Sequence, residues 1–233
     1  MDELNFNFLV GLPPDELIRY FEEKYQVTSW SWRDLYGSAN LSAFTVAKVM
    51  KEDILQDIYT ALDNAIRDGI TAEQFITRLA PELKSKGWWA RMFAKDVPGY
   101  DGMADPLDLV QLGSAHRLKT IYYTNLTSGY ARGRHAMQKD NIANRPFWQY
   151  KAVLDKNTRK KHGALDGVVI AADDPVWEVL YPPNGWGCRC YVRSLSRLQL
   201  EAEGLEVTQG ELIDTSWIAP EWRFNPGKDV KLK

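Results

Sequence analysis

Residues 155–192 read DKNTRKKHGALDGVVIAADDPVWEVLYPPNGWGCRCYV, and the prediction of the fold starts from this stretch. It contains both cysteines of the chain, Cys188 and Cys190, together with His162 and a turn built on two consecutive prolines. Residues two apart in an extended segment point to the same face, so the two thiols are predicted to face one way. Their alpha carbons would lie about 6.6 Å apart, near the upper limit for an unstrained disulfide. The spacing therefore favours two free thiols that bind a shared third group.

The side chains around these cysteines make the stretch a candidate zinc site. The thiolates of Cys188 and Cys190 and the imidazole of His162 are ligands that zinc prefers, and Asp155 is the candidate fourth ligand. A small, loop-rich module also gains from a bound metal. The competing interpretation is a pair of reduced, buried thiols hydrogen bonded to the histidine, and oxidative or catalytic use of the thiols is a third. The cofactor indicated by the sequence is structural zinc or none.

The same residues do not match the motif of a zinc deaminase. Those enzymes need H-x-E, with the glutamate as general acid and base, and P-C-x-x-C for the metal. Here Gly163 and Ala164 follow the histidine, and the cysteines are separated by one residue. Because no third group that would orient a cysteine–histidine pair can be identified from spacing, the chain is predicted not to be an enzyme.

Upstream of this stretch the apolar pattern is helical. Helices are predicted from about residue 14 to 24 and, as a long amphipathic helix, from 38 to 68, which Gly69 ends. Thr71 and Gln74 match a capping box at the start of a further helix, which runs to about residue 86 with a possible interruption at Pro81. These segments predict an N-terminal helical region that includes a helical hairpin.

The remaining segments complete an α+β fold: a region of long helices followed by a small, loop-rich α+β module. A loop is expected at 87–106, a third long helix at 107–139, a short helix capped by Ser194 or Ser196, and strands at 147–154, 168–171 and 189–192. From residue 217 the chain is expected to run over the surface as an arm. The predicted domains are 1–100 (helical region), 101–200 (module) and 201–233 (arm).

Composition restricts the partners. The 29 basic and 31 acidic residues give a formal charge of -2 and no general reason to bind DNA or an anionic membrane. Arg132, Arg134 and Lys139 near the end of the third helix form one local candidate for DNA contact, although the helix dipole also favours cations there. No run reaches the roughly 18 apolar residues of a membrane helix, and the acidic start does not look like a secretory signal. Two cysteines do not make an extracellular disulfide framework.

An ordered set of residues resembles a known family. The set comprises Asp155, Thr158, Arg159, His162, Leu165, Asp166, Gly167, Asp174, Pro175, Trp177, Tyr181, Pro182, Pro183, Asn184, Gly185, Cys188, Arg189 and Cys190. In this order and at this spacing it resembles the signature of the phage Mu F-like head morphogenesis proteins, a minor capsid family that includes the SPP1-type head protein. The resemblance covers most of the chain from about Val10 to Leu195, but members of the Mu type look longer at the C-terminus.

The resemblance implies a minor head protein of a phage or prophage. Its expected partners are the portal, capsid and scaffold proteins, with DNA as a further candidate and no membrane. The expected location is the interior of the phage head in the virion, and the host cytoplasm during assembly. The role would be structural, in capsid morphogenesis, genome packaging or ejection. The alternative is a virion-delivered enzyme that acts on nucleic acid through the His162 and cysteine cluster.

Overall fold

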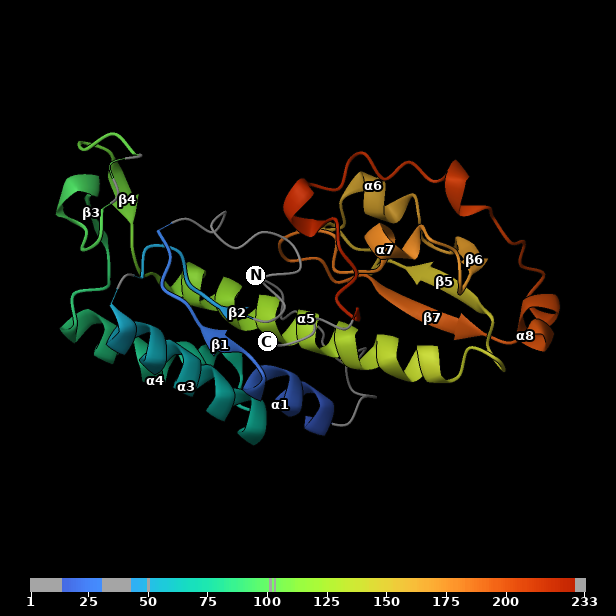
Figure 1. Cartoon of the computed structure of the whole chain (residues 1–233), viewed down its shortest axis with the longest axis horizontal. Helices are drawn as coiled ribbons and strands as arrows, with labels where there is room; N and C mark the ends of the chain where they lie inside the picture. Colours follow the sequence, from blue (N-terminus) through green and yellow to red (C-terminus); the bar gives the residue numbers. More distant parts are fainter. Residues whose placement is uncertain (1–13, 31–42, 50, 101, 103, 229–233) are drawn as a thin grey trace. The chain divides into compact units, whose positions relative to one another are not determined.

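A computed structural model of the chain describes residues 14–30, 43–49, 51–100, 102 and 104–228, and it has the α+β class predicted from the sequence (Figure 1). The described residues form two compact units, one up to Leu126 and one from Thr127 onward. Helix α5 (Ala115–Asp140) therefore contributes to both. The boundary between the two units, at Leu126 and Thr127, differs from the predicted boundary near residue 100. That the three predicted domains are independent stays a prediction.

Amphipathic helices build the first unit. Helix α3 (Glu52–Asp68) packs against α1 (Pro14–Glu22) and α4 (Ala72–Ser85), and Phe75 of α4 meets Tyr122 of α5 with ring centroids 5.6 Å apart. The buried residues on the facing sides are Leu17, Phe21, Ile54, Leu55, Ile58, Leu62, Phe75, Leu79, Leu83 and Leu118. Burying one such side chain contributes about 1.5–3 kcal/mol, so this apolar interior dominates the unit's stability. No helix in the described ranges is long and apolar enough to cross a membrane.

The predicted connection between α3 and α4 is confirmed. Gly69 ends α3 in the left-handed conformation at φ 65°, which glycine adopts without strain, and its N–H donates to the Ala65 carbonyl. Thr71 then caps α4: its hydroxyl accepts from the Gln74 N–H at 3.3 Å, and the Gln74 side chain accepts from the Thr71 N–H at 3.1 Å. Pro81 lies inside α4 without interrupting it.

The predicted helix 38–68 begins later than expected. Residues 38–42 lie outside the described residues, and Ala43–Phe44 form strand β2, which pairs in parallel with β1 (Tyr25–Gln26). Lys48 has a positive φ of 61°, and tertiary partners bind the nearby carbonyls: Arg117 donates to the Ala47 carbonyl and the Trp88 indole to that of Lys48. A helical period in the sequence could not reveal these distant donors.

The predicted helix 107–139 also begins later, at Ala115. Strand β4 (Leu109–Gln111) instead pairs antiparallel with β3 (Arg91–Phe93). The expected loop 87–106 therefore contains a strand and the short 3-10 helix η3 (Ala94–Asp96). Three-residue strands are too short for a two-residue alternation to stand out in the sequence.

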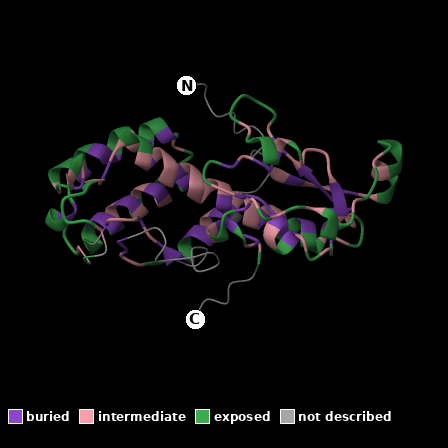
Figure 2. Ribbon diagram, turned by 90° about the horizontal axis from the view of Figure 1, so that it is seen from above, coloured by how far each residue is buried: buried purple, intermediate pink, exposed green. Residues whose placement is uncertain are grey.

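The second unit is built on a three-stranded antiparallel sheet in the order β6–β5–β7 (Figure 1). Its strands are β5 (Phe147–Lys151), β6 (Val169–Ala171) and β7 (Tyr191–Leu195), so the three predicted strands are present with ends shifted by at most three residues. Figure 2 shows that much of this sheet is buried. The C-terminal half of α5 belongs to this unit, where Gln138 donates a hydrogen bond of 2.8 Å to the Val192 carbonyl.

Short helices and loops surround the sheet. They include α6 (Lys160–Gly163), α7 (Trp177–Leu180), α8 (Arg197–Ala202), η4 (Gly210–Leu212) and η5 (Pro220–Trp222). The short helix predicted near the end of the module is α8. Of the two predicted caps, Ser196 is the N-cap, and it forms a capping box with Gln199. The predicted surface arm differs from the structure, because Ile218 and Trp222 are buried in the core of the unit. The described part of the tail is thus a packed layer of the module.

Candidate metal centre

The structure brings His162, Cys188 and Cys190 together inside the second unit. Nδ1 of His162 lies 3.4 Å from Sγ of Cys190 and 3.6 Å from Sγ of Cys188. The three donor atoms lie within 4.8 Å of one another, and all three side chains are buried. Both cysteines are free, as the one-residue spacing predicts. Three of the four candidate ligands therefore form a cluster that could bind a metal.

Asp155, the fourth candidate, instead joins the two loops that carry the cluster. Its carboxylate accepts two hydrogen bonds of 2.6 Å from Arg189, the residue between the cysteines, and one of 2.9 Å from the Asn157 N–H. The Arg189 guanidinium holds the pKa of Asp155 well below its usual range. The ion pair joins the segment that leads from Asp155 to His162 with the segment that carries the two cysteines (the cysteine loop). Asp155 itself lies outside the donor cluster.

A buried polar layer supports the cysteine loop. The Tyr150 hydroxyl, from the middle of β5, donates to Oδ1 of Asn184 at 3.0 Å, and the Asn184 side chain donates to the Leu180 carbonyl at 3.1 Å. A backbone hydrogen bond from Asn184 also reaches the sulfur of Cys188. Burial, followed by the nearness of the two sulfurs, raises the pKa of Tyr150, so the phenol stays a neutral donor.

The two sulfurs differ in acidity. The pKa of Cys188 is lowered because Cys190 donates a hydrogen bond to it, with His162 as a further partner. The pKa of Cys190 is raised, first because its thiol is the donor in that bond and second because it is buried. Cys188 is therefore the more acidic of the two thiols. Thiolates are the form in which cysteine binds metals and acts as a nucleophile.

A small cavity adjoins the cluster. Its volume is about 20 Å³, and its lining includes His162, Cys188 and Cys190 together with Thr158 and Arg159. A cavity needs about 10–15 Å³ to hold one water molecule, so this space takes a water but no organic substrate. An enzyme that acts on a nucleic acid through this centre would need the loops to move.

The aromatic side chain over the histidine is one that the sequence did not indicate. Trp217 lies against His162 with ring centroids 4.7 Å apart, whereas Trp177, Tyr181 and Trp186, which are closer to the cysteines in the sequence, have other neighbours. Trp177 and Tyr181 pack with other aromatics in the core, and Trp186 packs on Trp222 and is 40% exposed. Position 217 belonged to the predicted arm, and no sequence spacing connects it to the histidine.

Tyr150 was recognised only as a strand residue. The signal that could have placed it inside is its two-residue spacing from Trp148 on β5, because alternate residues of a strand share a face. Both residues are buried. The contact of Tyr150 with Asn184 depends on the path of the proline turn, which includes a cis bond between Pro182 and Pro183.

The three candidate DNA-binding residues lie near the C-terminal end of α5 but in different surroundings. Lys139 is exposed and Arg132 is partly exposed. The Arg134 guanidinium lies over the Tyr191 ring, 5.0 Å from its centroid, and burial lowers the pKa of Arg134. Lys139, which is exposed, is therefore better placed than Arg134 to meet a phosphate.

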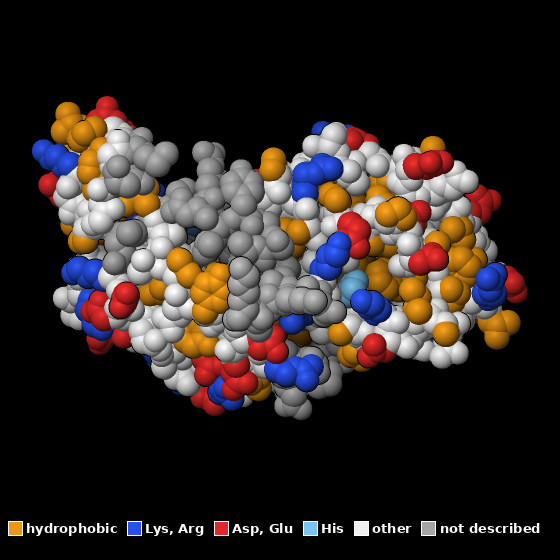
Figure 3. All heavy atoms as spheres, in the orientation of Figure 1, with side chains coloured by type: hydrophobic (Ala, Val, Ile, Leu, Met, Phe, Trp, Pro, Cys, Tyr) orange, Lys and Arg blue, Asp and Glu red, His pale blue; other side chains and the backbone are white. Residues whose placement is uncertain are grey.

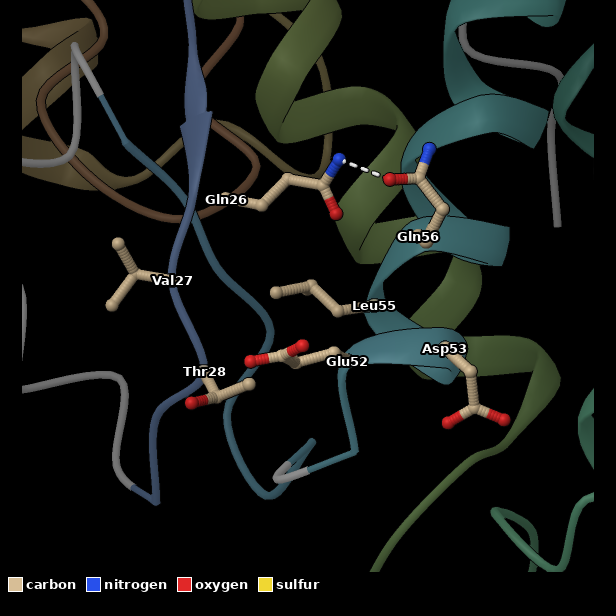
Figure 4. A pocket seen from close by; sticks show the side chains of 7 residues that line it. All are labelled: Gln26, Val27, Thr28, Glu52, Asp53, Leu55 and Gln56. Carbon is tan, nitrogen blue, oxygen red and sulfur yellow. Dashed lines mark hydrogen bonds between the residues drawn. The ribbon is translucent and has the colours of Figure 1, made fainter.

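The first unit contains a larger cavity, of about 650 Å³, between the β1 segment and the start of α3 (Figure 4). Its described lining includes Glu52 and Asp53, and a hydrogen bond of 2.7 Å joins Gln26 and Gln56 beside it. The lining offers two carboxylates but neither a cysteine nor a histidine among its described residues. The cluster of the second unit is therefore the stronger candidate for metal chemistry.

Comparison with known proteins gives two kinds of match. The family model described as Phage Mu protein F like protein matches residues 56–193. Among curated proteins, the chain is 38% identical over 207 residues to a protein of Escherichia phage Mu named "Putative capsid assembly protein F", covering 89% of this chain and 46% of that protein. It is 42% identical over 183 residues to the Mu-like prophage FluMu F protein of Haemophilus influenzae, covering 78% of this chain and 42% of that protein.

The chain thus spans about half the length of these curated relatives. No solved structure matches it with significant similarity.

Proposed function

Because this chain belongs to the family of phage Mu protein F like proteins, we propose that it acts in capsid assembly as a minor head protein of a phage or prophage. In this proposal it associates with the portal and the procapsid, enters the head interior of the virion, and is present in the host cytoplasm during assembly. Its role is structural rather than catalytic. Since the chain covers less than half of each relative's length, the role of a longer whole protein is part of the proposal.

The observation that carries the proposal is the extent of the family match. Residues 56–193 take in most of α3, all of α4, α5, β5 and β6, most of β7 and the cysteine loop. The similarity therefore includes much of the apolar interior of the first unit and the buried cluster of the second. A match over two packed units supports a shared role better than a match to one short motif would.

An exposed apolar surface supports contact with other head proteins. On the β3–β4 hairpin, Phe93 and Leu109 are cross-strand partners and both are exposed, as is Leu107 beside them. Hydrophobic side chains are visible at this end of the first unit, at the upper left of Figure 3. Contiguous exposed apolar side chains frequently mark protein interfaces. We assign this hairpin as the surface that meets the portal or capsid protein.

The test is copurification with the portal and capsid proteins of the phage or prophage that encodes the chain. The F93S/L109S variant should lose most of the copurified partner and keep its thermal unfolding midpoint within about 2 °C, because exposed side chains contribute little to stability. L198S is the matched control, since Leu198 is an exposed leucine on α8. Absence of both partners from the wild-type complex would refute the portal and capsid association.

DNA contact is the weaker part of the proposal and rests on Arg132 and Lys139. Phosphate contacts by these two side chains would give weak binding that falls steeply as salt is raised. The R132A/K139A double variant should reduce the slope of log K against log salt by about 2, at roughly 0.9 per phosphate contact. An unchanged slope would remove these residues from any DNA contact.

The structural role is tested against the enzyme alternative by an assay of the purified chain on single- and double-stranded nucleic acid. We expect no cleavage above that of a C188S preparation. Metal-dependent cleavage that the C188S variant lacks would overturn the structural role and establish a hydrolytic centre at the cluster.

A further inference from the structure

We propose that His162, Cys188 and Cys190 bind one Zn²⁺ ion through three protein ligands, with the fourth coordination position open to the adjoining cavity. The inference concerns the second unit by itself and does not depend on which head protein the chain contacts. In this site the protein supplies three bonds to the ion, and the exchangeable fourth ligand lies in the cavity.

The distances fit a shared ion. With Zn–S bonds of about 2.3 Å and a Zn–N bond of about 2.0–2.1 Å, tetrahedral geometry separates the nitrogen from each sulfur by about 3.6 Å. The observed separations from Nδ1 of His162 are 3.4 and 3.6 Å. One ring nitrogen carries a single hydrogen or a single lone pair in the ring plane, so it can hydrogen bond well to only one sulfur. Its near-equal approach to both sulfurs is the arrangement that a central ion requires.

The charges also fit. Two thiolates and a neutral imidazole around Zn²⁺ have a net charge of zero, which lowers the free-energy cost of burying them. Of the two guanidinium groups that line the cavity, that of Arg189 is balanced by the carboxylate of Asp155, and that of Arg159 donates to the Trp186 carbonyl. The ring of Trp217 lies against His162 and separates the imidazole from water on that side. The site is therefore built for a neutral complex.

The fourth position follows from the donor count and the cavity. Among the described residues, no further cysteine, histidine or carboxylate belongs to the group as a fourth ligand. The cavity beside the three donors has a volume of about 20 Å³, which exceeds the roughly 10–15 Å³ that one water needs. A water molecule completes the tetrahedron there. Structural zinc sites commonly have four protein ligands, whereas three ligands and a water leave a position that can be exchanged.

The experiment measures metal in the full chain, purified without chelators and after reconstitution with zinc. We expect about one zinc per chain, and strong thiolate-to-metal charge-transfer absorption when Co²⁺ replaces zinc. H162A, C188S and C190S should each lower the zinc content at least tenfold. H116A is the matched control, because His116 is an exposed histidine of α5 outside the cluster, and it should keep the full content.

Two further measurements test the ligand number. D155N and R189Q both break the Asp155–Arg189 ion pair, but only D155N removes a carboxylate, so the two variants should retain the same zinc content. A lower zinc content in D155N than in R189Q would overturn the three-ligand assignment. Added azide, a small anion, should change the visible spectrum of the Co²⁺ protein by replacing the water. An unchanged spectrum would show that the fourth position is closed and contradict the proposal.

The proposal remains testable if the cluster variants fail to fold. A wild-type chain that binds neither zinc nor Co²⁺ would overturn it, whatever the variants do. In the wild type, zinc at about one hundred times its dissociation constant should raise the unfolding midpoint by roughly 5–10 °C. Failure of this test leaves the copurification with portal and capsid proteins unaffected, so the two proposals fail separately.

Discussion

The contacts that join the elements inside the first unit differ from those inside the second unit. In the first unit, the faces of α1, α3, α4 and α5 meet through apolar side chains such as Leu62 and Phe75. The second unit also has a buried apolar cluster, which includes Trp148, Ile170 and Leu180, but single polar side chains in addition join segments far apart in its sequence. Asp174, for example, accepts from the Val176 N–H at 2.8 Å and from the Gly210 N–H at 3.0 Å.

This difference predicts which kind of mutation should destabilise each unit most. An apolar interior is a sum of many non-directional contacts, and its loss on mutation depends on the volume removed. A buried polar link depends on one geometry, and removing one partner leaves the other without a hydrogen bond in a place that water cannot reach. The first unit should therefore respond mainly to the size of a side chain, and the second also to its hydrogen-bonding atoms.

The largest expected effect is a cavity in the first unit. Leu62 is completely buried on α3, so L62A should lower the free energy of unfolding by about 2–5 kcal/mol. Asn64 is exposed on the same helix, and N64A is the control, with an expected change below about 0.5 kcal/mol. Urea unfolding followed by circular dichroism measures both. A loss below 1 kcal/mol in L62A would show that the apolar interior does not dominate this unit.

The same difference explains how far the sequence could predict the fold. The α3–α4 hairpin was predicted with its caps, because period and capping residues act within a few positions of each other. The start of α3 was missed, because distant side chains of Arg117 and Trp88 bind the carbonyls of residues 47 and 48.

Only part of the candidate site was predicted, because again only local sequence signals could be interpreted. His162, Cys188 and Cys190 were identified by their chemistry and short spacing, and the structure brings them together. Trp217 and Tyr150 were missed as neighbours of the cluster, because their positions depend on the path of loops that carry no periodic signal. Asp155 was expected among the donors, and only the structure shows that Arg189 occupies its carboxylate.

An intermediate effect is expected from a polar link in the second unit. Gln138 of α5 accepts from the Tyr181 hydroxyl at 2.8 Å and donates to the Val192 carbonyl at 2.8 Å, and both contacts are buried. Q138L keeps the approximate volume but leaves two polar groups unpaired, so it should lower the free energy of unfolding by about 1–3 kcal/mol.

The double-mutant cycle with Y181F separates hydrogen bonding from packing. Y181F removes the hydroxyl that Q138L leaves unpaired, so the double variant should lose less stability than the two single variants added together. The coupling free energy should be about 0.5–3 kcal/mol. Strict additivity would mean that the second unit also responds to side-chain volume alone, which would remove the contrast between the units.

The smallest effect is expected where a polar link is exposed. The pKa of Asp214 is lowered to about 2, because the Ser216 hydroxyl and N–H donate to its carboxylate, with Lys161 as an ion-pair partner at 3.3 Å. A carboxyl group of about pKa 3.9 in the unfolded chain that is depressed in the folded one adds stability above that value. This contribution is lost as the pH falls towards 2.

D214N removes the titration while its amide oxygen can still accept from Ser216. The stability difference between wild type and D214N should therefore be largest near pH 5 and should shrink as the pH falls through about 4 to 2. Urea midpoints of both proteins across this range measure the difference. Because the carboxylate is exposed, solvent screens the ion pair and the difference should stay below that of the buried Gln138 link. A difference that does not change with pH would show that Asp214 contributes through the shape of its turn and not through its charge.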